Sequence, residues 1–207
     1  SNFSLVMGVA GATHGQEGVL LAGLAGLLAG ALSMALGEWI SVKSSQELYE
    51  NQMEIEMEEL LTSPENEMKE LELIYKAKGI PEQQAREMAA QILQDPEHAH
   101  ELLVKEELGI NAEELKGSAF EAALYSFFLF AIGAIIPVFP FMFLSGTPAI
   151  LLSTAASAVG LFVIGAAITL FTGKSIWYSG FRQVIFGLAA AAITFGIGKL
   201  IGVSVAG

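Results

Sequence analysis

The sequence predicts an all-α, polytopic membrane protein with a charged helical insert, and three observations support this fold class. Hydrophobic residues make up 53% of the 207-residue chain and charged residues only 15%, against roughly 25% charged residues in a typical soluble domain. Almost all of the acidic residues lie between positions 44 and 118. The rest of the chain contains apolar runs of about the 20 residues that an α-helix needs to cross a bilayer. We therefore expect one part of the chain to lie in a membrane and the acidic part to lie in water.

Four apolar runs are long enough to span a membrane, and a fifth, at the start of the chain, is shorter. The four long runs cover 19–42, 119–144, 149–171 and 184–205. The opening run, 3–12, is typical of the second half of a spanning helix, which gives five transmembrane helices with the first one truncated. We expect 1–43 and 119–207 to form the membrane part, and 44–118 to form an insert between the second and third spans.

Basic residues near the ends of the spans predict the orientation, because cytoplasmic loops are enriched in Lys and Arg. Lys43 and Lys116 flank the insert, and Lys174 and Arg182 lie between the last two spans, whereas Lys199 is the single basic residue that disagrees. The insert is therefore predicted to be cytoplasmic. No eukaryotic sorting signal is visible, which favours the inner membrane of a bacterium or archaeon.

The charge balance and the missing residue types exclude several functions. A net charge of −12 disfavours nucleic acid and anionic membrane surfaces as partners, because both need clustered Lys and Arg. It favours cations. The chain has no cysteine, so a metal must be held by oxygen, imidazole or thioether groups. No phosphate-binding loop or nucleophile elbow is present, so we expect neither ATP-driven transport nor an enzyme.

The insert is divided into helices by its prolines and glycines. Proline stands at a predicted first helical position at Pro64, Pro81 and Pro96. Helices are expected over about 44–61, 64–78, 81–94 and 96–108, the first continuing out of the second span. Ser63 and Asp95 are expected to cap free backbone amides, and Gly79 and Gly109 to end helices.

Two glutamate pairs in the insert have the spacing of a metal site. Glu56 and Glu59 are three residues apart near the end of one predicted helix, and Glu67 and Glu70 are three apart near the start of the next. Each pair shares a helix face, so a tight turn at 62–64 would bring four carboxylates together, as in carboxylate-rich helical metal sites. Such oxygen ligands suit ferrous, manganous, calcium and magnesium ions. The alternative is a solvated acidic face.

A second candidate site lies in the second span, where Met34 and Glu38 are four residues apart and share a helix face. A thioether beside a carboxylate suits a borderline ion such as ferrous iron, and an ionisable residue in or near a span often has a function. The alternative is that Met34 fills a gap and Glu38 reaches the interface. His98 and His100, two residues apart on a predicted helix, point in different directions and are expected to be surface residues.

Three segments of the sequence together resemble the vacuolar iron transporter family. They are SNFSLVMGVAGA at 1–12, ALSMALGEW at 31–39 and EELG at 106–109. The resemblance covers essentially the whole chain, and the chain is similar to the transporter part of bacterial members that are fused to a ferritin-like domain.

The resemblance implies a homodimer that exchanges protons for ferrous iron and collects the metal on its cytoplasmic insert. It implies insert ligands at Glu56, Glu59, Glu67, Glu70 and Glu107. Two family methionines are replaced here by Leu103 and Val104, so manganese and zinc join iron as candidate ions. In the membrane, the family pairs the methionine that matches Met34 with an aspartate that would precede Ser1. We thus expect proton-coupled transport of Fe²⁺ out of the cytoplasm, or alternatively a membrane-anchored metal-binding or storage module without transport.

Overall fold

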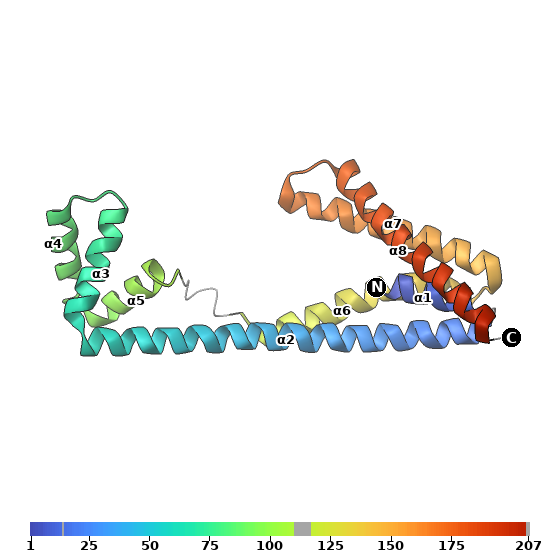
Figure 1. The fold of residues 1–207 in the computed structure, drawn as a ribbon, viewed down its shortest axis with the longest axis horizontal. Coiled ribbons are helices and arrows are strands. Elements are labelled where there is room, and N and C mark those ends of the chain that lie inside the picture. Colours follow the sequence, from blue (N-terminus) through green and yellow to red (C-terminus); the bar gives the residue numbers. More distant parts are fainter. Residues whose placement is uncertain (14, 110–116, 206–207) are drawn as a thin grey trace. The chain divides into compact units, whose positions relative to one another are not determined.

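The computed structural model describes residues 1–13, 15–109 and 117–205, and most of these residues are helical. The elements are α1 (Asn2–Ala12), α2 (Gln16–Thr62), α3 (Pro64–Ala77), α4 (Glu82–Ile92), α5 (Pro96–Glu106), α6 (Ala119–Val138), the 3₁₀ helix η2 (Phe139–Met142), α7 (Gly146–Thr172) and α8 (Ile176–Val205) (Figure 1). No strand occurs within these described ranges, which confirms the predicted all-α class. Lys116, used above to predict orientation, lies outside them.

Four helical segments are long and apolar enough to cross a membrane. They are α2, α6 with η2, α7, and α8 as far as Gly202, which confirms the four complete spans that the sequence predicts. Helix α8 begins at Ile176, eight residues before the apolar run, because helical structure also includes the aromatic and polar residues of 176–183. Helix α1 is apolar but has only 11 residues, so a truncated first span remains a prediction.

The chain divides into two compact units. The membrane unit consists of 1–37 and 123–207, and the insert unit consists of 38–122. Helix α2 contributes to both and has 47 residues, a length of about 70 Å at 1.5 Å per residue. The expected continuation of the second span into the insert is therefore confirmed.

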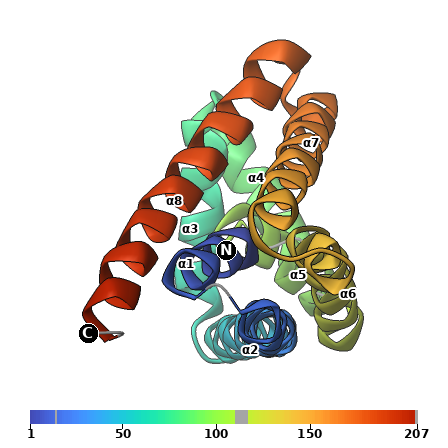
Figure 2. The same ribbon diagram turned by 90° about the vertical axis from the view of Figure 1, so that its right-hand side faces the viewer.

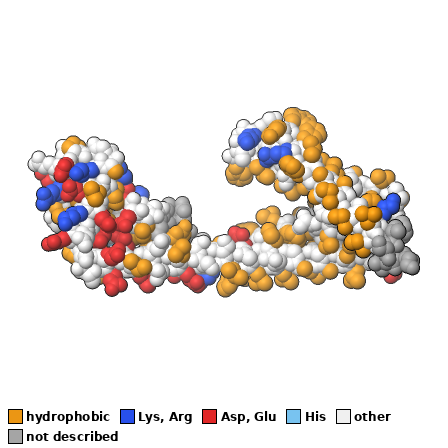
Figure 3. Space-filling model, viewed as in Figure 1, with side chains coloured by type: hydrophobic (Ala, Val, Ile, Leu, Met, Phe, Trp, Pro, Cys, Tyr) orange, Lys and Arg blue, Asp and Glu red, His pale blue; other side chains and the backbone are white. Residues whose placement is uncertain are grey.

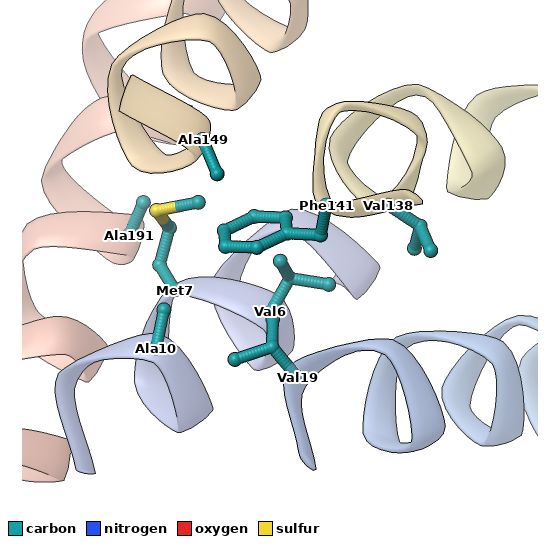
Figure 4. Close-up of a cluster of buried hydrophobic side chains, with 8 residues drawn as sticks. All are labelled: Val6, Met7, Ala10, Val19, Val138, Phe141, Ala149 and Ala191. Carbon is teal, nitrogen blue, oxygen red and sulfur yellow. The ribbon is translucent and has the colours of Figure 1, made fainter. Parts of the chain in front are cut away.

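The membrane unit is held by an apolar core to which α1, α2, α6, η2, α7 and α8 all contribute (Figure 4). Its buried members are Val6, Met7, Ala10, Val19, Val138, Phe141, Ala149 and Ala191. Helices α1 and α8 lie side by side (Figure 2), and their backbones approach closely through glycines. A Cβ atom on Gly198 would collide with the carbonyl oxygen of Gly8, and one on Gly202 with that of Ala12. Small residues at such contacts are typical of helix packing in membranes.

Polar side chains of α1 and α7 donate hydrogen bonds to backbone carbonyls of α2 and α6. The Asn2 amide donates to the carbonyls of Gly23 (3.3 Å) and Ala134 (2.8 Å), and the Ser153 hydroxyl donates to that of Pro137 (2.7 Å). Such bonds between helices are favourable in a bilayer, where no water is present to pair with polar groups. These bonds therefore link α1 and α7 to the irregular end of the third span.

The insert unit has its own core, which packs α3, α4 and α5 against the last turns of α2. The core is built from Leu60, Leu71, Tyr75, Ala85, Ala89, Ala99 and Leu103. Figure 3 shows acidic side chains gathered over the part of the chain that contains α3 to α5, and apolar side chains over the membrane helices. This segregation matches the charge pattern of the sequence.

The helix ends in the insert agree with the sequence in most places. At the end of α3, Gly79 has a φ of 89°, and the amide of Ile80 donates to the carbonyl of Tyr75 while that of Gly79 donates to Lys76, a glycine-terminated Schellman motif. The Asp95 carboxylate caps α5 by accepting from two amides.

The expected cap at Ser63 is wrong. Its side chain makes no capping bond, because the tight α2–α3 turn holds its backbone outside the extended region, at φ −138° and ψ 49°. The Ser63 carbonyl instead accepts from the amides of Asn66 and Glu67. Pro81 is likewise the residue before α4 rather than its first residue.

Candidate metal centre

The candidate site is built by three helices that meet at the edge of the insert core. Glu56 lies near the end of α2, Glu67 in the first turn of α3, and Glu107 immediately after α5. Each lies four residues from a core leucine on its own helix, and residues four apart share a helix face. These leucines are Leu60, Leu71 and Leu103. Packing of the core therefore carries one carboxylate from each helix to a common point.

The three carboxylates are close together and partly removed from water. One oxygen atom from each of Glu56, Glu67 and Glu107 lies within 4.8 Å of the others. Glu56 is 3% exposed and Glu67 is 4% exposed, whereas Glu107 is open to solvent. Oxygens on opposite sides of a bound divalent cation are about 4 to 5 Å apart. The cluster thus has the size of a coordination sphere around one ion.

Glu59 and Glu70 lie at the exposed rim of this cluster. The negative charges of Glu59 and Glu70 raise the pKa of Glu67 and of Glu107, and Glu70 also shares a hydrogen bond with Glu107. All five glutamates that the sequence and the resemblance single out in the insert are therefore neighbours in the structure.

Burial and mutual repulsion shift the protonation of the cluster. Burial raises the pKa of Glu56 from 4.5 to about 7, and the neighbouring carboxylates add to this shift, Glu107 most strongly. Burial also raises the pKa of Glu67, with Glu70 and Glu59 as further causes. The pKa of Glu107 rises for the same two reasons. Charged carboxylates are therefore unfavourable here unless a cation joins them.

The cluster has no positive partner within the described residues. The ion pairs found there are Lys43–Glu47, Lys76–Glu82 and Lys78–Glu106, and none includes a member of the cluster. One oxygen atom of Glu56 and one of Glu67 are fully buried without a hydrogen-bond partner. Buried polar atoms in proteins are nearly always paired, so these two oxygens are available to an ion.

The chemistry of the donor set favours a hard divalent cation. The three clustered residues offer only carboxylate oxygen, and within the described chain no histidine belongs to the group. Leu103 and Val104 are 0% and 2% exposed and belong to the packed interior. Carboxylate ligands suit Mg²⁺, Ca²⁺ and Mn²⁺ better than ions that prefer thiolates.

The second candidate site is less developed in the structure. Met34 and Glu38 are both exposed residues of α2, and Met34 is 51% exposed. Among the described residues, Glu38 is not part of a group of three or more His, Cys, Asp or Glu side chains that could hold a metal. Their role in a transport pathway remains a prediction.

Two contacts near the cluster were not apparent from the sequence. The ring nitrogen Nε2 of His100 lies 2.7 Å from the carbonyl oxygen of Met53 and ties α5 to α2, whereas His98 is exposed as expected. Lys78 pairs with Glu106 and so ties the end of α3 to the end of α5. The only sequence signal was that Glu106 sits at the negative end of a helix dipole, where a carboxylate needs compensation.

Comparison with known proteins places the chain in a family. The model of the VIT family matches residues 1–199. The chain belongs to the VIT family. A vacuolar iron transporter of Acanthamoeba castellanii is 36% identical over 195 residues, which cover 91% of this chain and 72% of that protein.

Two plant proteins extend the comparison of this VIT family member. Vacuolar iron transporter 1 of Oryza sativa subsp. japonica is 30% identical over 200 residues (96% of this chain, 79% of the relative). Vacuolar iron transporter 1 of Arabidopsis thaliana is also 30% identical over 200 residues (96% and 80%). Together with the four candidate spans, the family identifies an integral membrane protein of a metal-ion transporter family.

Proposed function

We propose that this protein transports ferrous iron out of the cytoplasm and that the insert is its loading site. One observation carries the proposal: three carboxylates from three helices meet within 4.8 Å, two of them buried and none with a positive partner in the described chain. A solvated acidic face would not bury carboxylates without partners. A cation at this point removes both the repulsion and the unpaired oxygens.

The choice of iron follows the relatives, which are named vacuolar iron transporters. The all-oxygen donor set extends the range to manganese, because Mn²⁺ prefers carboxylates. Zinc is a weaker candidate, since its usual protein sites include histidine or cysteine. We propose Glu56, Glu67 and Glu107 as the central ligands and Glu59 and Glu70 as ligands at the rim.

Coupling to protons is proposed from the same carboxylates. A group with a pKa near 7, such as Glu56, holds a proton part of the time at neutral pH, and the metal must displace it. Metal loading would therefore release protons, and acid would release metal. In the membrane, Met34 and Glu38 on α2 are proposed to receive the ion, with a thioether and a carboxylate as ligands.

Assembly as a homodimer with the insert on the cytoplasmic side is part of the proposal. Many apolar side chains of α2 are exposed in the single chain, among them Leu28, Leu32 and Leu36. Lipid or a second copy must cover such a face in a membrane. The basic residues Lys43, Lys174 and Arg182 favour the cytoplasmic placement.

The second candidate function is a membrane-anchored module that binds or stores metal without moving it. The contrast between a well-formed insert cluster and an undeveloped Met34–Glu38 site favours it. Both functions predict metal binding, but only the first predicts flux across a membrane.

The test is uptake of Fe²⁺ by liposomes that contain the purified full-length protein, under an imposed proton gradient and without oxygen. We compare the wild type with a Glu67→Gln, Glu70→Gln variant and with a matched control, Glu54→Gln, Glu58→Gln, which changes two exposed glutamates of α2. Transport predicts uptake that the first variant loses and the control keeps. Wild-type binding without uptake would favour the storage function, and no saturable binding would refute both.

A further inference from the structure

A shallow groove of about 450 Å³ runs along one face of the first turns of α8. It is lined by Trp177, Tyr178, Phe181, Arg182, Ile185 and Phe186. The lining is aromatic and aliphatic apart from one guanidinium, which lies 5.8 Å from the centre of the Tyr178 ring. The groove therefore combines an apolar wall with a fixed positive charge.

Contacts from α7 hold the aromatic wall in place. Phe162 lies 5.7 Å from Trp177 and 5.5 Å from Phe181, measured between ring centres, and Trp177 stacks on Phe181 at 6.0 Å. Gly180 leaves the space that the Phe162 ring occupies, since a Cβ there would meet that ring at 2.5 Å. Because these rings are packed against a second helix, the groove is a built feature of the α7–α8 hairpin.

Arg182 has no acidic partner in the membrane unit. Glu17 is the single acidic residue in 1–37 and 123–207, and it lies just after α1, whose end packs against Gly202 near the far end of α8. Arg182 and Gly202 are 20 residues apart on one helix, a distance of about 30 Å. The guanidinium is exposed and takes part in no ion pair among the described residues, so it is free to pair with a negative group from outside this unit.

The groove also lies at the right depth for a lipid headgroup. Trp and Tyr concentrate where a span meets the headgroups, and α8 is a candidate span of 27 residues, longer than the roughly 20 that the hydrocarbon core requires. Its first turns therefore extend into the headgroup region. Lys174, in the turn before α8, adds a second positive charge at this end, where Figure 3 shows basic side chains.

We propose that this groove binds one anionic phospholipid, whose phosphate pairs with Arg182 and whose acyl chain lies along Trp177, Phe181 and Phe186. Arg binds phosphate with two parallel hydrogen bonds, and Lys174 supplies the charge that distinguishes an anionic from a zwitterionic headgroup. The excess negative charge of the whole chain does not oppose this, because it belongs to the insert and the membrane unit itself carries three basic residues and one acid.

The test is native mass spectrometry of the full chain in detergent with phosphatidylglycerol and phosphatidylcholine at equal concentration. We expect preferential retention of one phosphatidylglycerol, reduced roughly tenfold in Arg182→Gln and largely kept in Arg182→Lys. The matched control, Lys199→Gln, removes an exposed basic residue at the other end of α8 and should leave retention unchanged.

Three results would overturn the proposal. These are equal retention of both lipids by the wild type, equal retention of phosphatidylglycerol by wild type and Arg182→Gln, and loss of the dimer or other assembly in Arg182→Gln with no change in lipid. The last result would mean that the groove is a contact between protein chains. Circular dichroism of each variant establishes that the helices are intact.

Discussion

Replacing Glu56 by glutamine tests whether the insert is strained by its own charge in the absence of metal. Glu56 is 3% exposed, and one of its oxygens has no hydrogen-bond partner. Glutamine has nearly the same shape and no charge. We therefore expect Glu56→Gln to stabilise the metal-free insert at alkaline pH and to remove much of its pH dependence.

The size of the effect follows from the pKa of Glu56. A carboxyl group with a raised pKa in the folded state keeps its proton longer than in the unfolded state, so stability is lost as pH rises from the unfolded to the folded pKa. A rise from 4.5 to about 7 lowers the free energy of unfolding by about 2.5 kcal/mol between pH 5 and pH 8 if Glu56 alone titrates. Sharing of the proton with Glu107 and Glu67 makes this an upper value.

The assay is hydrogen exchange of amides in α3 and α5 of the full chain in detergent with a chelator, corrected for intrinsic exchange. The wild-type insert should open more readily at pH 8 than at pH 5, and Glu56→Gln should reduce the difference. Glu54→Gln, an exposed neighbour on the same helix, is the matched control. Equal protection of the wild type at both pH values, or an unchanged pH dependence in Glu56→Gln, would refute the reasoning.

Three further predictions concern packing and helix ends. His100→Ala removes the contact with the Met53 carbonyl. It should lower the free energy of unfolding of the insert by about 1 kcal/mol, measured by urea unfolding, and reduce metal affinity roughly fivefold, measured by equilibrium dialysis. His98→Ala should change neither quantity. Gly198→Ala forces a collision between α8 and α1 and should cost about 1 to 3 kcal/mol in thermal unfolding of the membrane unit, whereas Gly196→Ala meets open space. Asp95→Ala removes the cap of α5 and should cost about 1 kcal/mol, seen as faster exchange in its first turn.

Each of these has a clear contrary result. Equal effects at the two histidines would mean that the contact with the Met53 carbonyl contributes nothing. Equal thermal unfolding of the two glycine variants would mean that α1 and α8 are not packed as closely as described. Unchanged exchange in Asp95→Ala would mean that the carboxylate bonds to the α5 amides contribute no stability.

The fold was largely predictable because its signals are local. Transmembrane spans are predicted by apolar runs that are at least as long as a bilayer is thick. Pro64 and Pro96 predict where insert helices begin, and Gly79 predicts where one ends. Sequence reasoning failed at Ser63, because whether a serine caps a helix depends on the backbone angles of a tight turn. The apolar run at 184–205 predicted the last span but not the start of its helix at Ile176, because hydropathy marks the apolar part of a span and not the helix that extends beyond it.

The two glutamate pairs could be predicted from the sequence, but the cluster that they form with Glu107 could not. The spacing of Glu56 with Glu59, and of Glu67 with Glu70, shows that each pair shares a face, which depends only on helix geometry. Glu107 is 40 residues from Glu67 and reaches the cluster only when α5 packs on the core, so the residues alone could not include it. The resemblance to a family supplied it.

The packing of α1 against α8 has a consequence for how the protein is made. These helices are separated by more than 160 residues of chain, yet Gly8 and Gly198 place their backbones in direct contact. During synthesis, α1 enters the membrane long before its partner exists. Its backbone contacts must wait until α8 has been inserted. A ribosome that stops before α8 therefore releases a chain whose α1 lacks this partner.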